Sequence, residues 1–168
     1  MWLASEAMFF GGLFAAWFFV RGQSDVWPPE GVHLDTPRTL VATVVLVISS
    51  FTMHAAHKAA ERHHDALATR WVLLTALLAV LFLGNQVLEW GELGFEVSSH
   101  AYGSLFYVLT GFHGLHVLGG VVLMLTVVGA ATGRSRMHLD EPLLVTSYYW
   151  HFVDVVWVAM FLVVYVVR

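Results

Sequence analysis

The sequence contains no cysteine and few charged residues. Without cysteine the chain cannot form disulfides, iron–sulfur clusters or metal sites with sulfur ligands, so any metal would need histidine and carboxylate ligands. Only 12% of the residues are charged and 58% are hydrophobic, whereas soluble domains carry about a quarter charged residues. The net charge of −4 is small and scattered, and it does not favour nucleic-acid binding. The composition predicts an integral membrane protein.

Five apolar runs are each long enough to cross a bilayer as a helix. A hydrocarbon core about 30 Å thick requires roughly 20 helical residues. The runs cover residues 2–20, 38–57, 71–90, 101–132 and 142–167, and the connections between them are short. We therefore predict an all-α fold, with residues 1–168 forming a single membrane domain of five transmembrane helices.

Charges and prolines in the connections give further expectations. The N-terminus lacks the basic region of a cleaved signal peptide, so we expect the first run to remain as a spanning helix. Pro28, Pro29 and Pro37 predict a rigid, non-helical first connection. More basic residues gather on the side of the second and fourth connections than on the other, which predicts a cytoplasmic N-terminus and an outer C-terminus.

The segment YYWHFVDVVW places ionisable side chains in the last apolar run. An ionised aspartate at the centre of a membrane helix costs about 2.5–3.5 kcal/mol, so Asp154 must be paired or protonated. Helical spacing puts His151 on the same face as Asp154. One interpretation is a pair that handles protons, and the other is a polar clasp to a neighbouring helix or subunit. The spacing favours the clasp and leaves proton transfer open.

The fourth run contains a stripe of polar and aromatic residues that includes His113 and His116. Two histidines three residues apart could hold a metal only with ligands from other helices. Tyr102 and Gly120 lie on the same stripe, and the glycines of this run favour a tight helix crossing with hydrogen-bonded histidines.

Two further polar positions stand out in the other runs. Glu6 follows a serine in the first run, where it could relay protons, sense an ion, or lie near the lipid headgroups. Asn85, Gln86 and Glu89 form a polar cluster late in the third run, for which we expect a structural role at the outer boundary.

Four segments stand in the order that a known family shows: SEAMFFGGLFAAWFF, WPPEGVHLDTP, YGSLFYVLTGFHGLHVLGG and SYYWHFVDVVW. On these segments the chain resembles subunit III of haem–copper cytochrome c oxidases over nearly its whole length. It is similar to the five-helix bacterial form, and its last segment is similar to actinobacterial examples.

The resemblance implies a subunit that carries no redox centre of its own, within an oxidase of the bacterial plasma membrane. Haem and copper would lie in partner subunits I and II, and electrons would come from cytochrome c. The chain would stabilise subunit I, support proton uptake, and hold phospholipid in a cleft between two helix groups that gives oxygen access. A respiratory supercomplex is a further possible partner.

The resemblance also assigns site residues. Glu6 corresponds to the family's buried carboxylate. Seven residues are candidates for helix packing, lipid contact or subunit contact: Trp27, Tyr102, His113, His116, Trp150, His151 and Asp154. No catalytic residue or metal ligand is assigned. The chain departs from many members in having Leu144 in place of a glutamate and Lys58 in place of a second histidine.

Other functions remain open at this point. The chain could be the equivalent subunit of a quinol oxidase or of a protein linked to nitric oxide reductase. It could also be a small proton-coupled transporter built around Glu6 and Asp154, although the two matching halves typical of such transporters are not evident. A membrane cytochrome would use His54, His113 or His151 to ligate haem.

Overall fold

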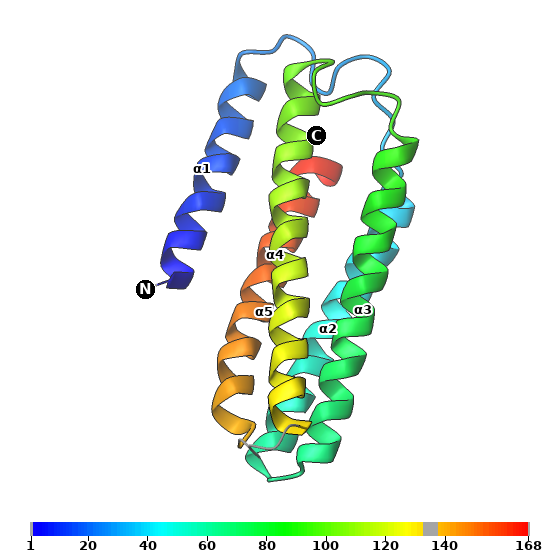
Figure 1. Cartoon of the computed structure of the whole chain (residues 1–168). Helices are drawn as coiled ribbons and strands as arrows, with labels where there is room; N and C mark the ends of the chain where they lie inside the picture. The colour runs from blue at the N-terminus through cyan, green and yellow to red at the C-terminus, as the bar shows by residue number, and fades with distance from the viewer. Residues whose placement is uncertain (1, 133–137, 168) are drawn as a thin grey trace.

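The computed structural model describes residues 2–132 and 138–167, which form five long helices (Figure 1). They are α1 (Trp2–Gly22), α2 (Thr36–Glu61), α3 (Asp65–Glu92), α4 (Ala101–Thr132) and α5 (Asp140–Phe161). A π-helical turn, η1 (Leu162–Val166), continues α5. All five helices are long and apolar enough to cross a membrane, and the described residues contain no strand. The predicted all-α fold with five membrane-spanning helices is confirmed.

α1, α2, α3 and α5 extend beyond their apolar runs by a few residues, whereas α4 has the predicted bounds. α2 begins at Thr36, where the Asp35 side chain accepts a hydrogen bond from the Arg38 backbone N–H at 3.1 Å. Pro37 lies in the first turn of α2, where a backbone donor is not needed and the fixed φ of proline suits the helix. The prediction that Pro37 belongs to the non-helical connection is therefore wrong, whereas Pro28 and Pro29 do lie in it.

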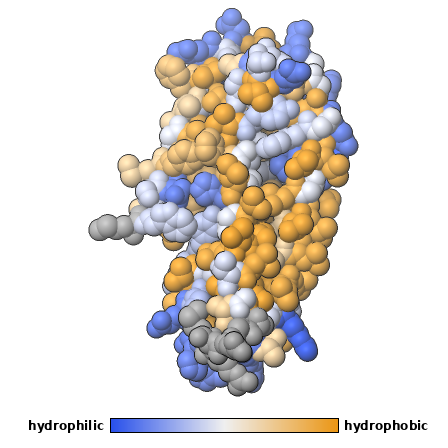
Figure 2. Space-filling view, in the orientation of Figure 1, coloured by the Kyte–Doolittle hydropathy of each residue, from blue (hydrophilic) through white to orange (hydrophobic). Residues whose placement is uncertain are grey.

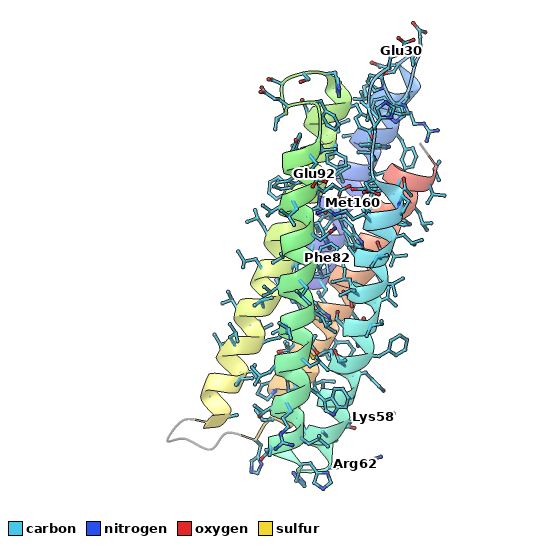
Figure 3. The ribbon with its side chains drawn as sticks, turned by 90° about the vertical axis from the view of Figure 1, so that its right-hand side faces the viewer. Glu30, Lys58, Arg62, Phe82, Glu92 and Met160 are labelled. Carbon is cyan, nitrogen blue, oxygen red and sulfur yellow. The ribbon has the colours of Figure 1, made fainter. Side chains whose placement is uncertain are left out.

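Four of the helices pack around a common core and the fifth stands beside them. α2 packs between α3 and α5, and α4 also contacts both α3 and α5. α1 lies against α4 and α5, and it buries only Phe10 and Trp17 (Figure 1). Phe82 lies midway along the bundle and Met160 lies nearer the end that carries Glu30, and both side chains are buried between the helices (Figure 3). Most of the surface of α1 is left for lipid or a partner.

The distribution of polar side chains divides the molecule into a central band and two ends. Hydrophobic side chains dominate the middle of the visible face, and hydrophilic ones gather at the ends (Figure 2). One end carries the α1–α2 and α3–α4 connections, including Glu30, and the other carries Lys58 and Arg62 (Figure 3). An apolar middle with two polar ends fits a bundle whose five helices each cross the membrane. Which end faces the cytoplasm stays a prediction.

Candidate functional site

Ser50 of α2 lies between the two ionisable residues of the last helix. Its hydroxyl donates to Asp154 Oδ2 and lies 2.9 Å from His151 Nδ1. Asp154 is 5% exposed and His151 is half-buried. The sequence pointed to His151 as the nearest partner of Asp154, but in the structure a serine from another helix connects them.

The hydrogen bonds of Ser50 restrict where protons can reside. A hydroxyl has one hydrogen, so when Ser50 donates to the carboxylate, its oxygen must accept the hydrogen on His151 Nδ1. In the alternative state, protonated Asp154 donates to Ser50 and Ser50 donates to Nδ1. If Nε2 keeps its hydrogen, the two states interconvert when two protons each move across one hydrogen bond, and the net charge does not change. The arrangement can therefore act as a clasp or as a short proton relay.

Two tryptophans on α5 extend this contact along α2. Trp150 Nε1 donates to Ser49 Oγ at 2.9 Å, and Trp157 Nε1 donates to Thr43 Oγ1 at 3.0 Å. Both indole rings are buried. Three small hydroxyl residues of α2, including Ser50, thus hold successive turns of α5, and the indole N–H groups of Trp150 and Trp157 are both hydrogen-bonded.

Glu6 of α1 pairs with His116 of α4. Glu6 Oε2 lies 3.0 Å from His116 Nε2, and both side chains are largely buried. His116 is near the centre of α4, about 23 Å from its start and about 24 Å from its end at 1.5 Å per residue. Glu6 therefore lies level with the middle of α4, and the first turn of α1 lies beside the middle of the bundle (Figure 1).

The Glu6–His116 pair shares one proton. His116 Nδ1 lies 2.7 Å from the Phe112 carbonyl oxygen, which can only accept, so Nδ1 must carry a hydrogen. The contact at Nε2 then needs one further hydrogen, on the carboxyl group or on the ring. The pair is either a neutral carboxylic acid with a neutral imidazole or an ion pair, and both states have no net charge.

His113 and His116 point to different neighbours although they share one helix. His113 is 1% exposed, and its ring centroid lies 4.9 Å from that of Trp157 and 5.9 Å from that of Phe82. Neither ring nitrogen has a hydrogen-bond partner among the described residues. The expectation of two hydrogen-bonded histidines thus holds for His116 and is wrong for His113. The two imidazoles do not converge on one metal position.

Trp27 and Tyr102 meet at the end of the bundle where the first connection crosses. Trp27 lies 5.0 Å from Tyr102 and 5.0 Å from Trp17 of α1, measured between ring centroids. Trp17 in turn lies 5.2 Å from Tyr102. These three rings hold the connection and the end of α1 against α4, which gives Trp27 and Tyr102 a packing role in the structure.

A buried carboxylate in α3 accepts hydrogen bonds from side chains that the sequence could not identify as its partners. Glu89 is 3% exposed, and its Oε1 accepts hydrogen bonds from Thr39 at 3.0 Å and from Tyr165 at 2.9 Å. Nearby, Arg38 donates to Asn85 at 2.9 Å and also binds Glu92. The polar cluster was expected, but its hydroxyl partners in α2 and η1 carry no charge and lie far away in sequence.

An apolar groove lies between α3 and α4. It has a volume of about 630 Å³. Gly111 and Gly114 of α4 are among its lining residues, and their lack of side chains leaves space for the groove. Trp90 and Tyr107 lie at the end near the α3–α4 connection, with their ring centroids 5.6 Å apart. A groove of this shape can hold a flexible hydrocarbon chain and can place a lipid headgroup near the two aromatic rings.

Comparisons with known proteins agree on one kind of protein. A family model described as cytochrome c oxidase subunit III matches residues 1–167. The probable cytochrome c oxidase subunit 3 of Nocardia farcinica is 42% identical over 173 residues, covering 100% of this chain and 85% of that protein. That of Mycobacterium tuberculosis is 42% identical over 174 residues, with the same two shares. The cytochrome c oxidase subunit 3 of Thermostichus vulcanus is 36% identical over 168 residues, covering 99% of this chain and 84% of that protein.

Proposed function

Because the chain belongs to the cytochrome c oxidase subunit III family, we propose that it is the non-catalytic subunit III of a proton-pumping oxidase fed by cytochrome c. Its membership of a terminal oxidase complex and its multiple membrane crossings follow from the family and the five helices. The bacterial plasma membrane is the proposed location, because the relatives compared above are bacterial. Haem and copper would be held by partner subunits I and II.

One observation carries the proposed role: the polar residues of the family segments bind helices together within this chain. Ser50 joins α2 to α5, and Glu6 with His116 joins α1 to α4. Polar side chains that join helices within the chain support the proposal that this subunit is a rigid structural element that stabilises subunit I. Each pair can also hold a shared proton, which supports a secondary role in proton uptake.

The groove between α3 and α4 supports the proposal that the subunit holds phospholipid. Its lining is almost entirely apolar, and Trp90 and Tyr107 supply the aromatic rim that headgroup regions favour. The cleft expected for lipid was one between two helix groups, and this groove instead separates two adjacent helices of one bundle. An acyl chain there would also offer oxygen an apolar path into the complex.

Purification of the complex through a tag on this chain tests the proposed function. In mild detergent, we expect two larger subunits to co-purify and the visible spectrum to show haem a. Haem b or haem o without a copper-bearing subunit II would instead indicate a quinol oxidase. Isolation of the tagged chain alone, with haem bound to it or with proton transport in liposomes, would contradict the proposal.

We predict that Glu6→Gln shortens the active life of the oxidase during sustained turnover while the initial rate stays within about twofold. Glutamine can still bond His116 and hold α1, but it cannot carry the shared proton. Oxygen consumption followed over many turnovers measures the loss. Ser5→Ala is the matched control, because among the described residues the Ser5 hydroxyl donates to the Trp2 carbonyl of its own helix. An unchanged inactivation rate in Glu6→Gln would contradict this prediction.

A further inference from the structure

A groove of about 270 Å³ lies between α2 and α5 on the outside of the bundle. Ser50, His151 and Asp154 supply its polar lining, and three valines, Val47, Val155 and Val158, supply the apolar part. Val155 is 68% exposed, so no described part of this chain covers the groove. In a membrane, this face must meet lipid or another protein.

The polar groups of the groove lie near the middle of the membrane-spanning segments. Asp154 is about 21 Å from the start of α5 and about 18 Å from the end of η1, at 1.5 Å per residue. Ser50 lies about 21 Å from the start of α2 and about 17 Å from its end. Lipid headgroups do not reach this depth, and acyl chains cannot form hydrogen bonds.

Hydrogen bonding in the groove is incomplete within the described chain. Asp154 Oδ1 is buried and has no hydrogen-bond partner among the described residues. His151 uses Nδ1 for Ser50, so its Nε2 is the group left for a neighbour. Buried polar groups in a membrane are usually satisfied by protein, and an ionisable residue there normally faces a partner or an aqueous cavity.

The outward side chains of α5 form a straight line on both sides of His151. Their spacing alternates between four and three residues over about 27 Å, and they are Leu144, Tyr148, His151, Val155, Val158 and Leu162. A second helix laid along this line would contact apolar side chains at both ends and the polar groups at its centre. Helices are the usual means by which proteins bring a hydrogen-bonding side chain to this depth.

We propose that the α2–α5 face docks a transmembrane helix of another chain of the oxidase complex. This helix presents a hydrogen-bonding side chain to His151, whose Nε2 is the polar group of the groove left for a neighbour. The proposal rests on the proposed function, because it takes the partner from the same complex. Under this proposal, the polar residues of α5 contact another chain of the complex in addition to α2 of their own chain.

Photo-crosslinking in the intact complex tests the docking face. A photoreactive amino acid is placed at Val155 and, as a control, at Val80, which is an exposed valine at similar depth on α3. We expect Val155 to crosslink to a transmembrane segment of another oxidase subunit, identified by mass spectrometry, at least fivefold more than Val80 does. Crosslinks to lipid only, to a second copy of this chain, or at equal yield from both sites would overturn the proposal.

A bulky substitution provides an independent measurement. Val155→Trp should reduce co-purification of the crosslinked subunit several-fold, while Val80→Trp leaves it unchanged, because the larger side chain blocks only the docking face. If Val155→Trp leaves the subunit composition intact, the docking proposal fails. If the unmodified chain does not co-purify with haem-bearing subunits, the proposed function itself fails, so the two failures are distinguishable.

Discussion

Replacing Trp150 with alanine is expected to destabilise the folded subunit by about 3–5 kcal/mol, the cost typical of deleting a fully buried large aromatic side chain. Trp150 is 0% exposed and lies where three helices meet. Its indole nitrogen binds Ser49 of α2, and its ring fills the space opposite Gly120 of α4. Alanine would leave a cavity between α2, α4 and α5. Unfolding of the purified complex, followed by heat or by SDS titration, measures the loss.

Matched variants separate the contributions of the ring and its hydrogen bond. Trp150→Phe keeps part of the ring and loses the bond to Ser49, which costs about 1 kcal/mol. Gly120→Ala should also destabilise, because its Cβ would lie 2.7 Å from Trp150 Cζ3. Gly114→Ala on the same helix should be neutral or stabilising, since its nearest neighbour is Leu83 at 3.8 Å. Equal stability of the two glycine variants would show that α4 and α5 do not pack closely at Trp150.

The existence of the five helices was predictable because each apolar run exceeds the length that a bilayer requires. The ends were less predictable, since they depend on individual side chains. Asp35 caps α2 and Pro37 fits its first turn, so the helix begins before the apolar residues do. At the other end α2 continues through polar residues to Glu61, because helical hydrogen bonding does not stop at the membrane boundary.

The site was only partly predictable, because a sequence shows which residues share a helical face but not which helix that face meets. Asp154 and His151 were identified by their charge, whereas Ser50 is one of many hydroxyl residues and carries no such signal. Three residues turn a helix by about 300°, so His113 and His116 differ in direction by about 60°. Because α4 has neighbours on two sides, this difference places His113 in the core and His116 against α1.

The Glu6–His116 pair shows the same limit over a longer distance. The two residues are 110 positions apart, and either could have found another partner. The resemblance to a family identified Glu6 as a candidate buried carboxylate, and the structure identified His116 as the residue with which it can share a proton.

Replacing Asp154 with asparagine is expected to weaken retention of the subunit in the complex about tenfold or more, while the initial turnover rate stays close to normal. Asparagine oxygen can still accept from Ser50, but the amide nitrogen then takes the position of Oδ1, which has no described partner. An unsatisfied buried donor costs about 1–3 kcal/mol, and 1.4 kcal/mol corresponds to a tenfold change in an equilibrium constant.

Subunit ratios after purification and the first-turnover rate distinguish assembly from chemistry in the Asp154→Asn variant. Asp25→Asn in the exposed first connection is the control, because it makes the same chemical change without a buried neighbour. Normal subunit ratios combined with loss of the first turnover would mean that Asp154 acts in proton transfer. The opposite result, loss of the subunit with a normal first turnover in the complexes that keep it, would mean that the Ser50 bridge mainly holds helices together. We expect the second result, because both states of the bridge bind α2 to α5 and only their exchange moves protons.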